Sequence, residues 1–203
     1  MSINSPKLSD GRTIEDPPLA KFLFTDVRMA WFWLIVRLWV GYKWIDAGWH
    51  KVTGEGYMDG GSALQGYWER AVAIPAEGRP MISFDWYRSF LQFMLGTESY
   101  RWFAPLIALG EVLVGVGLIV GAFVGIAAFF GALMNWNFIM AGSASTNGVL
   151  LILAIGLMLA WKIAGYYGAD YYLLRWLGVP WKNRNGKTEN ESVQPGLVPQ
   201  RVS

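Results

Sequence analysis

Long apolar stretches alternate with polar segments along this chain, and their lengths fit membrane crossings. Apolar residues dominate positions 29–49 and then most of positions 103–165, whereas charged residues gather outside these stretches. A helix needs roughly 20 mostly apolar residues to cross the hydrocarbon core of a bilayer. The pattern therefore predicts four membrane-spanning helices, at residues 29–49, 103–121, 124–141 and 147–165.

Glycine, proline and small polar residues indicate where these spans begin and end. Gly121 and Gly125 lie in the long apolar stretch and favour a tight reversal between the second and third spans. The polar run 142–147 separates the third span from the fourth, and Pro105 suits the first turn of the second span.

The segments outside the spans differ in character. Residues 1–28 carry charges and adjacent prolines without the apolar core of a signal peptide, which predicts an N-terminal segment that is not cleaved. Residues 50–102 contain several glycines and then two short helix patterns, near residues 63–73 and 83–95, that suit a loop with interfacial helices. Residues 166–181 favour a helix at the membrane surface, and residues 182–203 favour a disordered polar tail. The predicted fold class is an all-α, polytopic membrane four-helix bundle with an extracytoplasmic helical loop between the first and second spans.

The distribution of positive charge predicts the orientation. With four spans, both ends of the chain lie on the same side, and together they carry more Lys and Arg than the long loop. Positive residues accumulate on the cytoplasmic side of a membrane. We therefore expect a multi-pass protein of a prokaryotic cytoplasmic membrane, with both termini in the cytoplasm and residues 50–102 outside.

Composition narrows the chemistry. Hydrophobic residues make up 54% of the chain and the net charge is only +2, so no broad basic surface points to a nucleic acid partner. Cysteine is absent and histidine occurs once, at His50, which excludes disulfides, thiolate-bound metals, iron–sulfur clusters and bis-histidine haem ligation within this chain. No haem, iron–sulfur or other metal site is expected from this chain alone. Redox chemistry would need an organic carrier or a partner subunit.

Charged residues inside the predicted spans are the candidate functional residues. Arg37, Lys43 and Asp46 lie in the first span and Glu111 in the second. One unpaired charge at mid-bilayer costs about 2.5–3.5 kcal/mol, so these charges are expected to face one another. The depth of each charged residue in the bilayer can be counted from the tryptophans at the outer ends of the two spans. By this measure both Lys43 and Arg37 remain possible partners of Glu111.

Two interpretations of these charges stay open. Trp39, Lys43, Asp46 and His50 follow at helical spacing and form a polar stripe that leads to the outer surface. Ionisable residues inside a membrane often line a pathway or a site. A buried ion network that only fixes the helix register would show the same residues.

The order of these motifs resembles the DoxX and DoxD-like family of membrane proteins. The run RLWVGYKWIDAGWHK, at residues 37–51, has that family's Arg-Leu pair, a glycine and then Gly-x-x-Lys. A glutamate that opens a glycine-rich second helix and an AG-x-x-G-x-D stretch after the fourth span complete the resemblance, which covers the four spans but not the tails. The residues concerned are Arg37, Leu38, Gly41, Gly48, Lys51, Glu111, Gly115, Gly117, Gly121, Ala164, Gly165, Gly168 and Asp170.

The resemblance implies a four-helix membrane subunit. In the DoxD branch, which the long loop at residues 50–101 fits better, it implies the small subunit of a thiosulfate:quinone oxidoreductase. Such an enzyme oxidises thiosulfate to tetrathionate outside the membrane and passes the electrons to quinone. Partner subunits, or further copies of the chain, are then expected in the lipid bilayer.

Two functional hypotheses follow. In the first, a quinone lies between the helices, protons move through Glu111 or Asp46, and an anionic sulfur substrate is drawn to the cations near the outer surface. The residues expected to contact quinone or substrate are Arg37, Trp39, Lys43, His50, Lys51, Arg101 and Asn137. In the second, the protein is a non-catalytic subunit that anchors or assembles a larger membrane complex through its Trp-rich faces. A proton-coupled anion carrier is a more distant third, because four spans usually need oligomerisation to form an alternating-access site.

Overall fold

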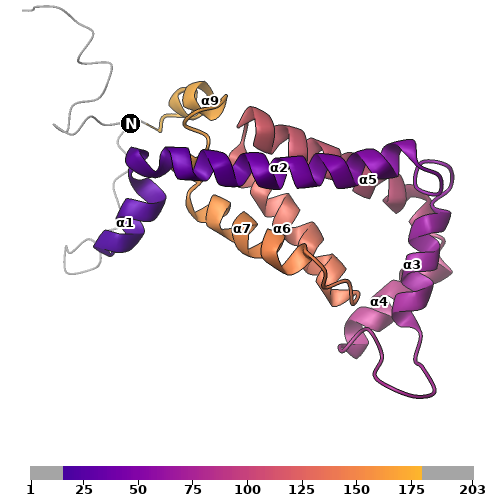
Figure 1. The fold of residues 1–203 in the computed structure, drawn as a ribbon. Helices are drawn as coiled ribbons and strands as arrows, with labels where there is room; N and C mark the ends of the chain where they lie inside the picture. Colours follow the sequence, from indigo (N-terminus) through magenta and orange to yellow (C-terminus); the bar gives the residue numbers. More distant parts are fainter. Residues whose placement is uncertain (1–15, 180–203) are drawn as a thin grey trace, which may run out of the picture.

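A computed structural model describes residues 16–179, and in this part of the chain every regular element is a helix (Figure 1). The prediction of an all-α fold is therefore confirmed for the described residues. The four longest helices of the bundle are α2 (Ala30–Thr53), α5 (Tyr100–Val120), α6 (Val124–Met140) and α7 (Asn147–Leu159). α2 packs against α5, α5 against α6, and α6 against α7.

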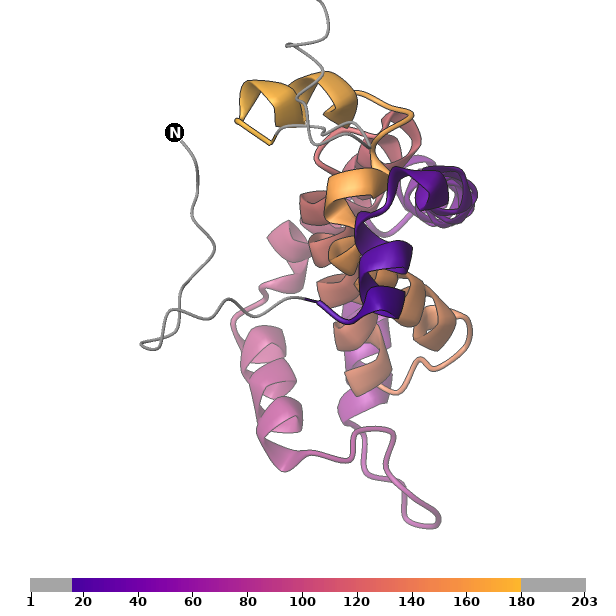
Figure 2. The ribbon, with the colours of Figure 1, turned by 90° about the vertical axis from the view of Figure 1, so that its left-hand side faces the viewer.

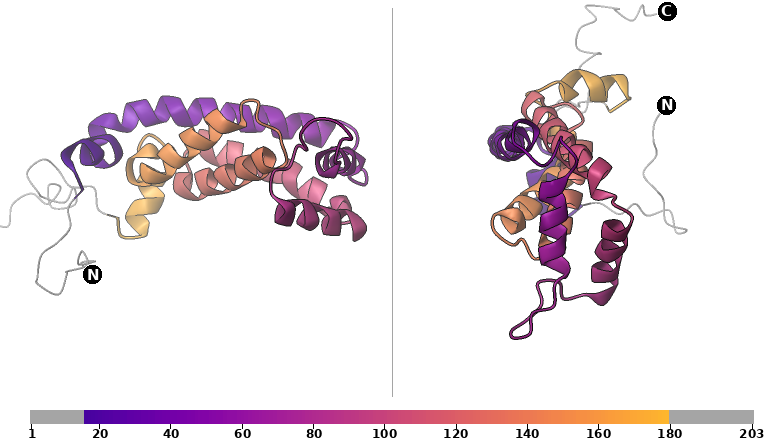
Figure 3. Two further views of the ribbon diagram at one scale, coloured as in Figure 1. Left: turned by 90° about the horizontal axis from the view of Figure 1, so that it is seen from below. Right: turned by 90° about the vertical axis from the view of Figure 1, so that its right-hand side faces the viewer.

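Shorter helices lie at the two ends of this bundle. At one end are α3 (Ser62–Val72) and α4 (Asp85–Gly96), which belong to the long segment between α2 and α5. At the other end are α1 (Pro18–Thr25), η1 (Val27–Met29), α8 (Trp161–Ala164) and α9 (Asp170–Trp176). Figure 2 views the molecule from the end that carries α1 and α9, and Figure 3 shows α3 and α4 at the opposite end.

Length and composition single out α5 as a candidate for crossing a membrane. Among the described residues, it alone is both long and apolar enough to cross a membrane, with 21 residues. α6 and α7 are apolar but shorter. α2 has 24 residues, but Arg37, Lys43 and Asp46 interrupt its apolar sequence.

α2 and α5 approach each other closely because glycines remove side chains at their contact. A Cβ atom at Gly48 would lie 2.8 Å from the backbone nitrogen of Val112, and one at Gly115 would lie 2.7 Å from the backbone nitrogen of Ile45. A Cβ atom at Gly41 would lie 3.1 Å from the carbonyl oxygen of Gly115. These contacts fix how far the two helices are shifted along each other, and they place the end of α2 beside the middle of α5.

The interior consists of two hydrophobic clusters. The larger lies among α2, α5, α6, α7 and α8, and its members include Trp33, Trp44, Leu118, Leu157 and Ile163. The second lies where α3 and α4 pack against the first turns of α5, and includes Leu64, Trp68, Tyr87, Leu91 and Tyr100. The second cluster gives the long segment between α2 and α5 a core of its own.

The helix ends differ in places from the boundaries expected from the sequence. α2 continues to Thr53, and α5 begins at Tyr100, so Pro105 lies inside α5 and not in its first turn. Gly121 ends α5 with a φ of 72°, as predicted, whereas Gly125 lies inside α6 against Trp161.

One helix was not expected from the sequence, and one predicted segment lies outside the described residues. α1 was not indicated by the sequence pattern; it is held to α2 where the indole nitrogen of Trp33 donates to the carbonyl oxygen of Leu23 at 2.8 Å. The predicted disordered tail at residues 182–203 lies outside the described residues, as do residues 1–15.

Candidate functional site

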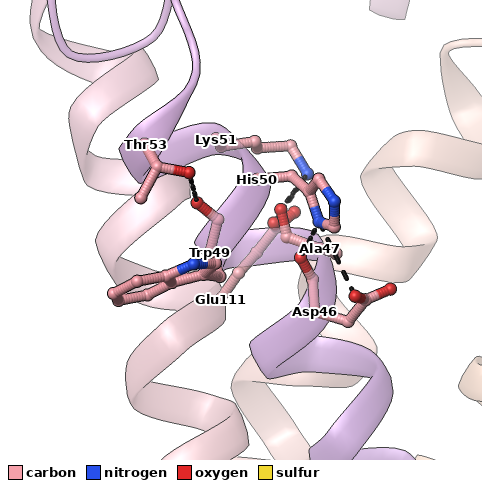
Figure 4. Close-up of polar contacts among 7 residues, drawn as sticks. All are labelled: Asp46, Ala47, Trp49, His50, Lys51, Thr53 and Glu111. Carbon is pink, nitrogen blue, oxygen red and sulfur yellow. Dashed lines mark hydrogen bonds and ion pairs between the residues drawn. The ribbon is translucent and has the colours of Figure 1, made fainter.

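Glu111 and Lys51 form a buried ion pair between α5 and α2. The Glu111 side chain is 1% exposed, and its Oε2 lies 2.6 Å from the Nζ of Lys51 (Figure 4). Lys51 belongs to the last turn of α2, and its side chain leans back along the helix toward Glu111. The prediction that Lys43 or Arg37 would pair with Glu111 is therefore wrong, because Lys51 takes that position.

A cavity of about 360 Å³ lies beside this pair. Its walls come from α2, α3, α5, α6, α7, the segment that follows α2 and the turn before α7. The polar part of the lining includes Lys43, Asp46, Lys51, Tyr57, Glu111 and Asn135. The site therefore combines both signs of charge with neutral hydrogen-bonding groups.

Two buried polar side chains in the cavity wall have no hydrogen-bond partner within the described part of the chain. They are the indole nitrogen of Trp44 and both the nitrogen and the oxygen of the Asn135 amide. Trp44 is 3% exposed and Asn135 is 0% exposed. A buried polar group without a partner costs about 1–3 kcal/mol, so these atoms indicate a place for a polar molecule.

Gly131 explains why the Trp44 indole reaches α6. A Cβ atom at Gly131 would lie 3.2 Å from the indole nitrogen of Trp44. Gly131 lies one helical turn before Asn135, so the indole nitrogen and the Asn135 amide are presented by the same stretch of the wall.

Two tyrosines add neutral donors to the cavity. Burial raises the pKa of Tyr57 to about 12, and the nearby Glu111 carboxylate adds to the effect. Burial also raises the pKa of Tyr67 above its usual value. Both phenols therefore stay protonated at neutral pH, and the Tyr67 hydroxyl already donates to the carbonyl oxygen of Phe138 at 3.4 Å.

The other predicted site residues are only partly brought together. Lys43 and Asp46 line the cavity, whereas Trp39 is 43% exposed and is not part of the lining. His50 is exposed, with its Nδ1 2.7 Å from the carbonyl oxygen of Asp46 and 3.6 Å from its Oδ1 (Figure 4). Arg101 forms an ion pair at the surface, 63% exposed, away from the cavity.

Asn137 contributes to a different place from the one predicted. It lines a second cavity of about 160 Å³, and its amide nitrogen donates to the carbonyl oxygen of Leu133 at 2.8 Å. Asn135, two residues earlier, faces the first cavity in its place. In the sequence, Asn135 is recognisable as an amide within an apolar span. Asn137 has the same property, so the sequence does not show which of the two faces the first cavity.

Arg37 lies elsewhere, at the end of the bundle where α5 turns into α6. Its Nη1 donates to the carbonyl oxygens of Leu118 at 2.6 Å and Ile119 at 3.1 Å, and its Nη2 donates to that of Tyr167 at 2.8 Å. The last carbonyls of a helix have no partner within the helix, and a cation suits that end of its dipole. Arg37 thus closes the C-terminal end of α5 and does not contact Glu111.

Asp170 closes the start of α6 in the same region. Its carboxylate accepts from the backbone nitrogens of Phe123 at 2.6 Å and Val124 at 2.9 Å, and its own backbone nitrogen donates to Gly121 at 2.7 Å. Burial raises the pKa of Asp170, while these two backbone donors and the nearby Arg37 guanidinium act in the opposite direction. Arg37 and Asp170 thus close two helix ends through backbone hydrogen bonds, and Arg37 is not in an ion network with Lys43, Asp46 or Glu111.

Several of the residues that carry the DoxX resemblance lie in these two places. Gly48, Lys51 and Glu111 meet at the cavity, and Arg37 meets Gly121, Gly168 and Asp170 at the α5–α6 reversal. Comparison of the chain with family models, curated proteins and solved structures finds no match. Membership of the DoxX family stays a prediction.

Proposed function

We propose that this protein crosses the membrane several times, with α2, α5, α6 and α7 as a four-helix bundle in the bilayer. The outward surface of the bundle supports this proposal, because Leu113 on α5 and Ile152 on α7 are both 70% exposed. Only 33% of the apolar window in α5 is buried, whereas a core helix of a soluble protein would be mostly buried. Large exposed apolar surfaces are rare in soluble monomers but favourable in lipid.

The proposed topology places both termini in the cytoplasm of a prokaryotic cell. α3 and α4 then lie at the extracytoplasmic surface of the membrane, at the end of the bundle opposite α1 and α9. The greater number of Lys and Arg residues near the two termini supports this orientation.

Within this bundle, we assign quinone binding to the cavity beside Glu111 and Lys51, which makes the protein the membrane subunit of a quinone-linked oxidoreductase. The observation that carries this assignment is the pair of buried groups without partners, the Trp44 indole and the Asn135 amide. Both donate hydrogen bonds, and the carbonyl oxygens of a quinone accept them. The cavity volume of about 360 Å³ lies within the usual range of small-molecule sites.

The residues around the cavity have roles that suit this chemistry. Bound quinone would accept two electrons and two protons, and two thiosulfate ions supply two electrons when they join through a new sulfur–sulfur bond as tetrathionate. Trp44 and Asn135 hold the ring oxygen, and the Lys51–Glu111 pair keeps an exchangeable proton beside it. Asp46, which lines the cavity and is exposed, connects the site to water.

The binding test compares matched residues inside and outside the cavity. Trp44→Phe and Asn135→Leu are each expected to weaken binding of a benzoquinone without a side chain at least about tenfold, since each removes a buried hydrogen bond. Trp39→Phe and Asn137→Leu are the controls, because they change the same residue types outside this cavity. Isothermal titration in lipid nanodiscs measures the affinity. Absence of binding to the unchanged protein, or equal losses in all four variants, would overturn the assignment.

The redox test follows electron transfer in the complete assembly. Thiosulfate-dependent reduction of a quinone analogue is measured with the gently solubilised protein and whatever subunits copurify with it. Glu111→Gln is expected to lower turnover in assemblies of normal composition, because the pair beside the cavity loses its carboxylate. If the variant had the same turnover as the unchanged protein, Glu111 would have no part in proton transfer to the quinone.

A second candidate function, a non-catalytic anchor of a larger complex, is favoured by one observation. α9 presents Trp176 at 85% exposure and Tyr172 at 74% exposure. Exposed aromatic residues of this kind are enriched at protein interfaces and at membrane surfaces. Under this alternative, Trp176→Ala lowers the yield of the complex, while Glu111→Gln leaves its turnover unchanged.

A further inference from the structure

A second cavity adjoins the quinone cavity. It has a volume of about 160 Å³ and lies between the α3–α4 segment and helices α5 and α6. Tyr67 and Phe138 line both cavities, so the two spaces adjoin at these side chains.

The second cavity suits an apolar group. Its lining is almost entirely carbon, with Trp68, Leu91 and Ile107 among its members. The polar groups at its edge already have partners, since the Tyr87 hydroxyl donates to the carbonyl oxygen of Asn137 at 3.1 Å. A polar ligand would therefore gain few hydrogen bonds there, whereas a hydrocarbon chain would bury its surface at no such cost.

The second cavity also reaches the outer apolar surface. Phe90 on α4 and Leu133 on α6 line it, and they are 46% and 43% exposed. The two cavities thus lie one behind the other between the outside of the bundle and Glu111, with the side chains of Tyr67 and Phe138 between them. The outer cavity is apolar, and the inner cavity is polar.

We propose that the second cavity holds the apolar side chain of the quinone whose ring occupies the first cavity, and that the ring reaches Glu111 from lipid between α4 and α6. This inference rests on the proposed function. It also gives α3 and α4 a role, since together with α5 and α6 they enclose the chain. Tyr67 and Phe138 are the residues between which the chain passes.

The first experiment compares a dimethoxy-methyl-benzoquinone with its decyl derivative, by titration in nanodiscs with a correction for partition into lipid. The unchanged protein is expected to bind the decyl derivative at least about tenfold more tightly, because several methylene groups become buried. Ile107→Phe and Ala141→Leu narrow the second cavity and are expected to abolish this advantage while leaving the affinity for the ring within about twofold. Leu113→Phe, on the exposed face of α5, is the control.

The outcomes separate the inference from the function on which it rests. If the ring binds and the narrowed variants keep the advantage of the decyl chain, the second cavity is not its site and the inference is overturned. If the ring does not bind to the unchanged protein, the proposed function fails and the inference fails with it.

A second experiment uses only the unchanged protein, because a narrowed variant can fail to fold. A quinone with a photoreactive group at the end of its alkyl chain is bound, activated and mapped by mass spectrometry. Labels in α4 or α6 near Phe90 or Leu133 support the proposed route. Labels confined to other helices overturn it.

Discussion

At the scale of single residues, Lys51 and Glu111 depend on each other. Glu111→Gln leaves an ammonium group that is 21% exposed, and Lys51→Met leaves a carboxylate that is 1% exposed without its cation. Each change is expected to lower the free energy of unfolding by about 3–5 kcal/mol, with the larger loss for Lys51→Met. The double variant should recover part of the loss, with a coupling of roughly 0.5–3 kcal/mol.

Unfolding in detergent micelles measures these differences. Arg101→Met, which breaks an exposed pair with Glu98, is the control and is expected to cost less than about 1 kcal/mol. Strictly additive losses in the Lys51 and Glu111 double variant would contradict a direct interaction between the two side chains.

Tyr57 and Tyr87 give a pH dependence at the alkaline end. Burial raises the pKa of each to about 12, whereas an unfolded tyrosine loses its proton near pH 10. The folded state thus holds these protons more tightly, so their contribution to stability is complete below pH 10 and is lost as the pH rises toward 12.

Absorbance of tyrosinate against pH measures this effect. We expect a step in the titration near pH 12, and we expect this step to disappear in a Tyr57→Phe, Tyr87→Phe double variant. A titration of the unchanged protein that is complete near pH 10 would be inconsistent with two buried phenols.

The sequence indicated the chemistry of the candidate site better than its geometry. The acid at Glu111 and the need for a cation beside it followed from the cost of a charge in lipid. The identity of that cation, Lys51, did not follow. The depth of each residue in the bilayer was counted from the tryptophans, whereas the glycine contacts determine how far α2 and α5 are shifted along each other. Asn135 and Asn137 were not distinguishable either, since α6 is apolar all round and its sequence does not show which side faces inward.

At the scale of helices, the contact between α2 and α5 is expected to be sensitive to one methyl group. Gly115→Ala would place a Cβ atom 2.7 Å from the backbone nitrogen of Ile45, so the helices must separate, at a cost of about 1–3 kcal/mol. Gly110 on the same helix is the matched control, because the nearest atom to a Cβ there is the Sδ of Met134 at 3.8 Å. Gly110→Ala is expected to be neutral or to stabilise by up to about 1 kcal/mol through helix propensity.

Thermal unfolding of both variants provides the measurement. Similar shifts for Gly110→Ala and Gly115→Ala would mean that the close approach at Gly115 does not limit stability. A loss confined to Gly115→Ala would identify the glycine contacts as the feature that sets the register.

Most helices were predictable because apolar runs and their interruptions are local features. Gly121 was recognisable as a reversal, since glycine tolerates the left-handed backbone that ends α5 there. α1 was missed because it is short and packs against α8, whose residues are distant in the sequence. The closure of the α5–α6 reversal by Arg37 and Asp170 also joins residues that are distant in the sequence, and it was missed for that reason.

At the scale of the whole molecule, the proposed bundle predicts where a new charge is tolerated. Leu113→Lys and Ile152→Lys, each at a site with 70% exposure, would place an ammonium group in lipid at a cost of about 2.5–3.5 kcal/mol. Ile74→Lys is the matched control, since Ile74 is 69% exposed but lies between α3 and α4. The amount of each variant in the membrane fraction is the measurement. Equal yields for all three would argue against lipid around α5 and α7.

The closure of the α5–α6 reversal by Asp170 has a consequence for biosynthesis. The carboxylate that accepts from Phe123 is translated 47 residues after it, which takes a few seconds at typical ribosome speeds. During that interval the hairpin is synthesised without the carboxylate that accepts from the backbone nitrogens of Phe123 and Val124. α9, which begins at Asp170, therefore completes a hairpin made much earlier, and a chain that stops before residue 170 lacks the carboxylate that closes the hairpin.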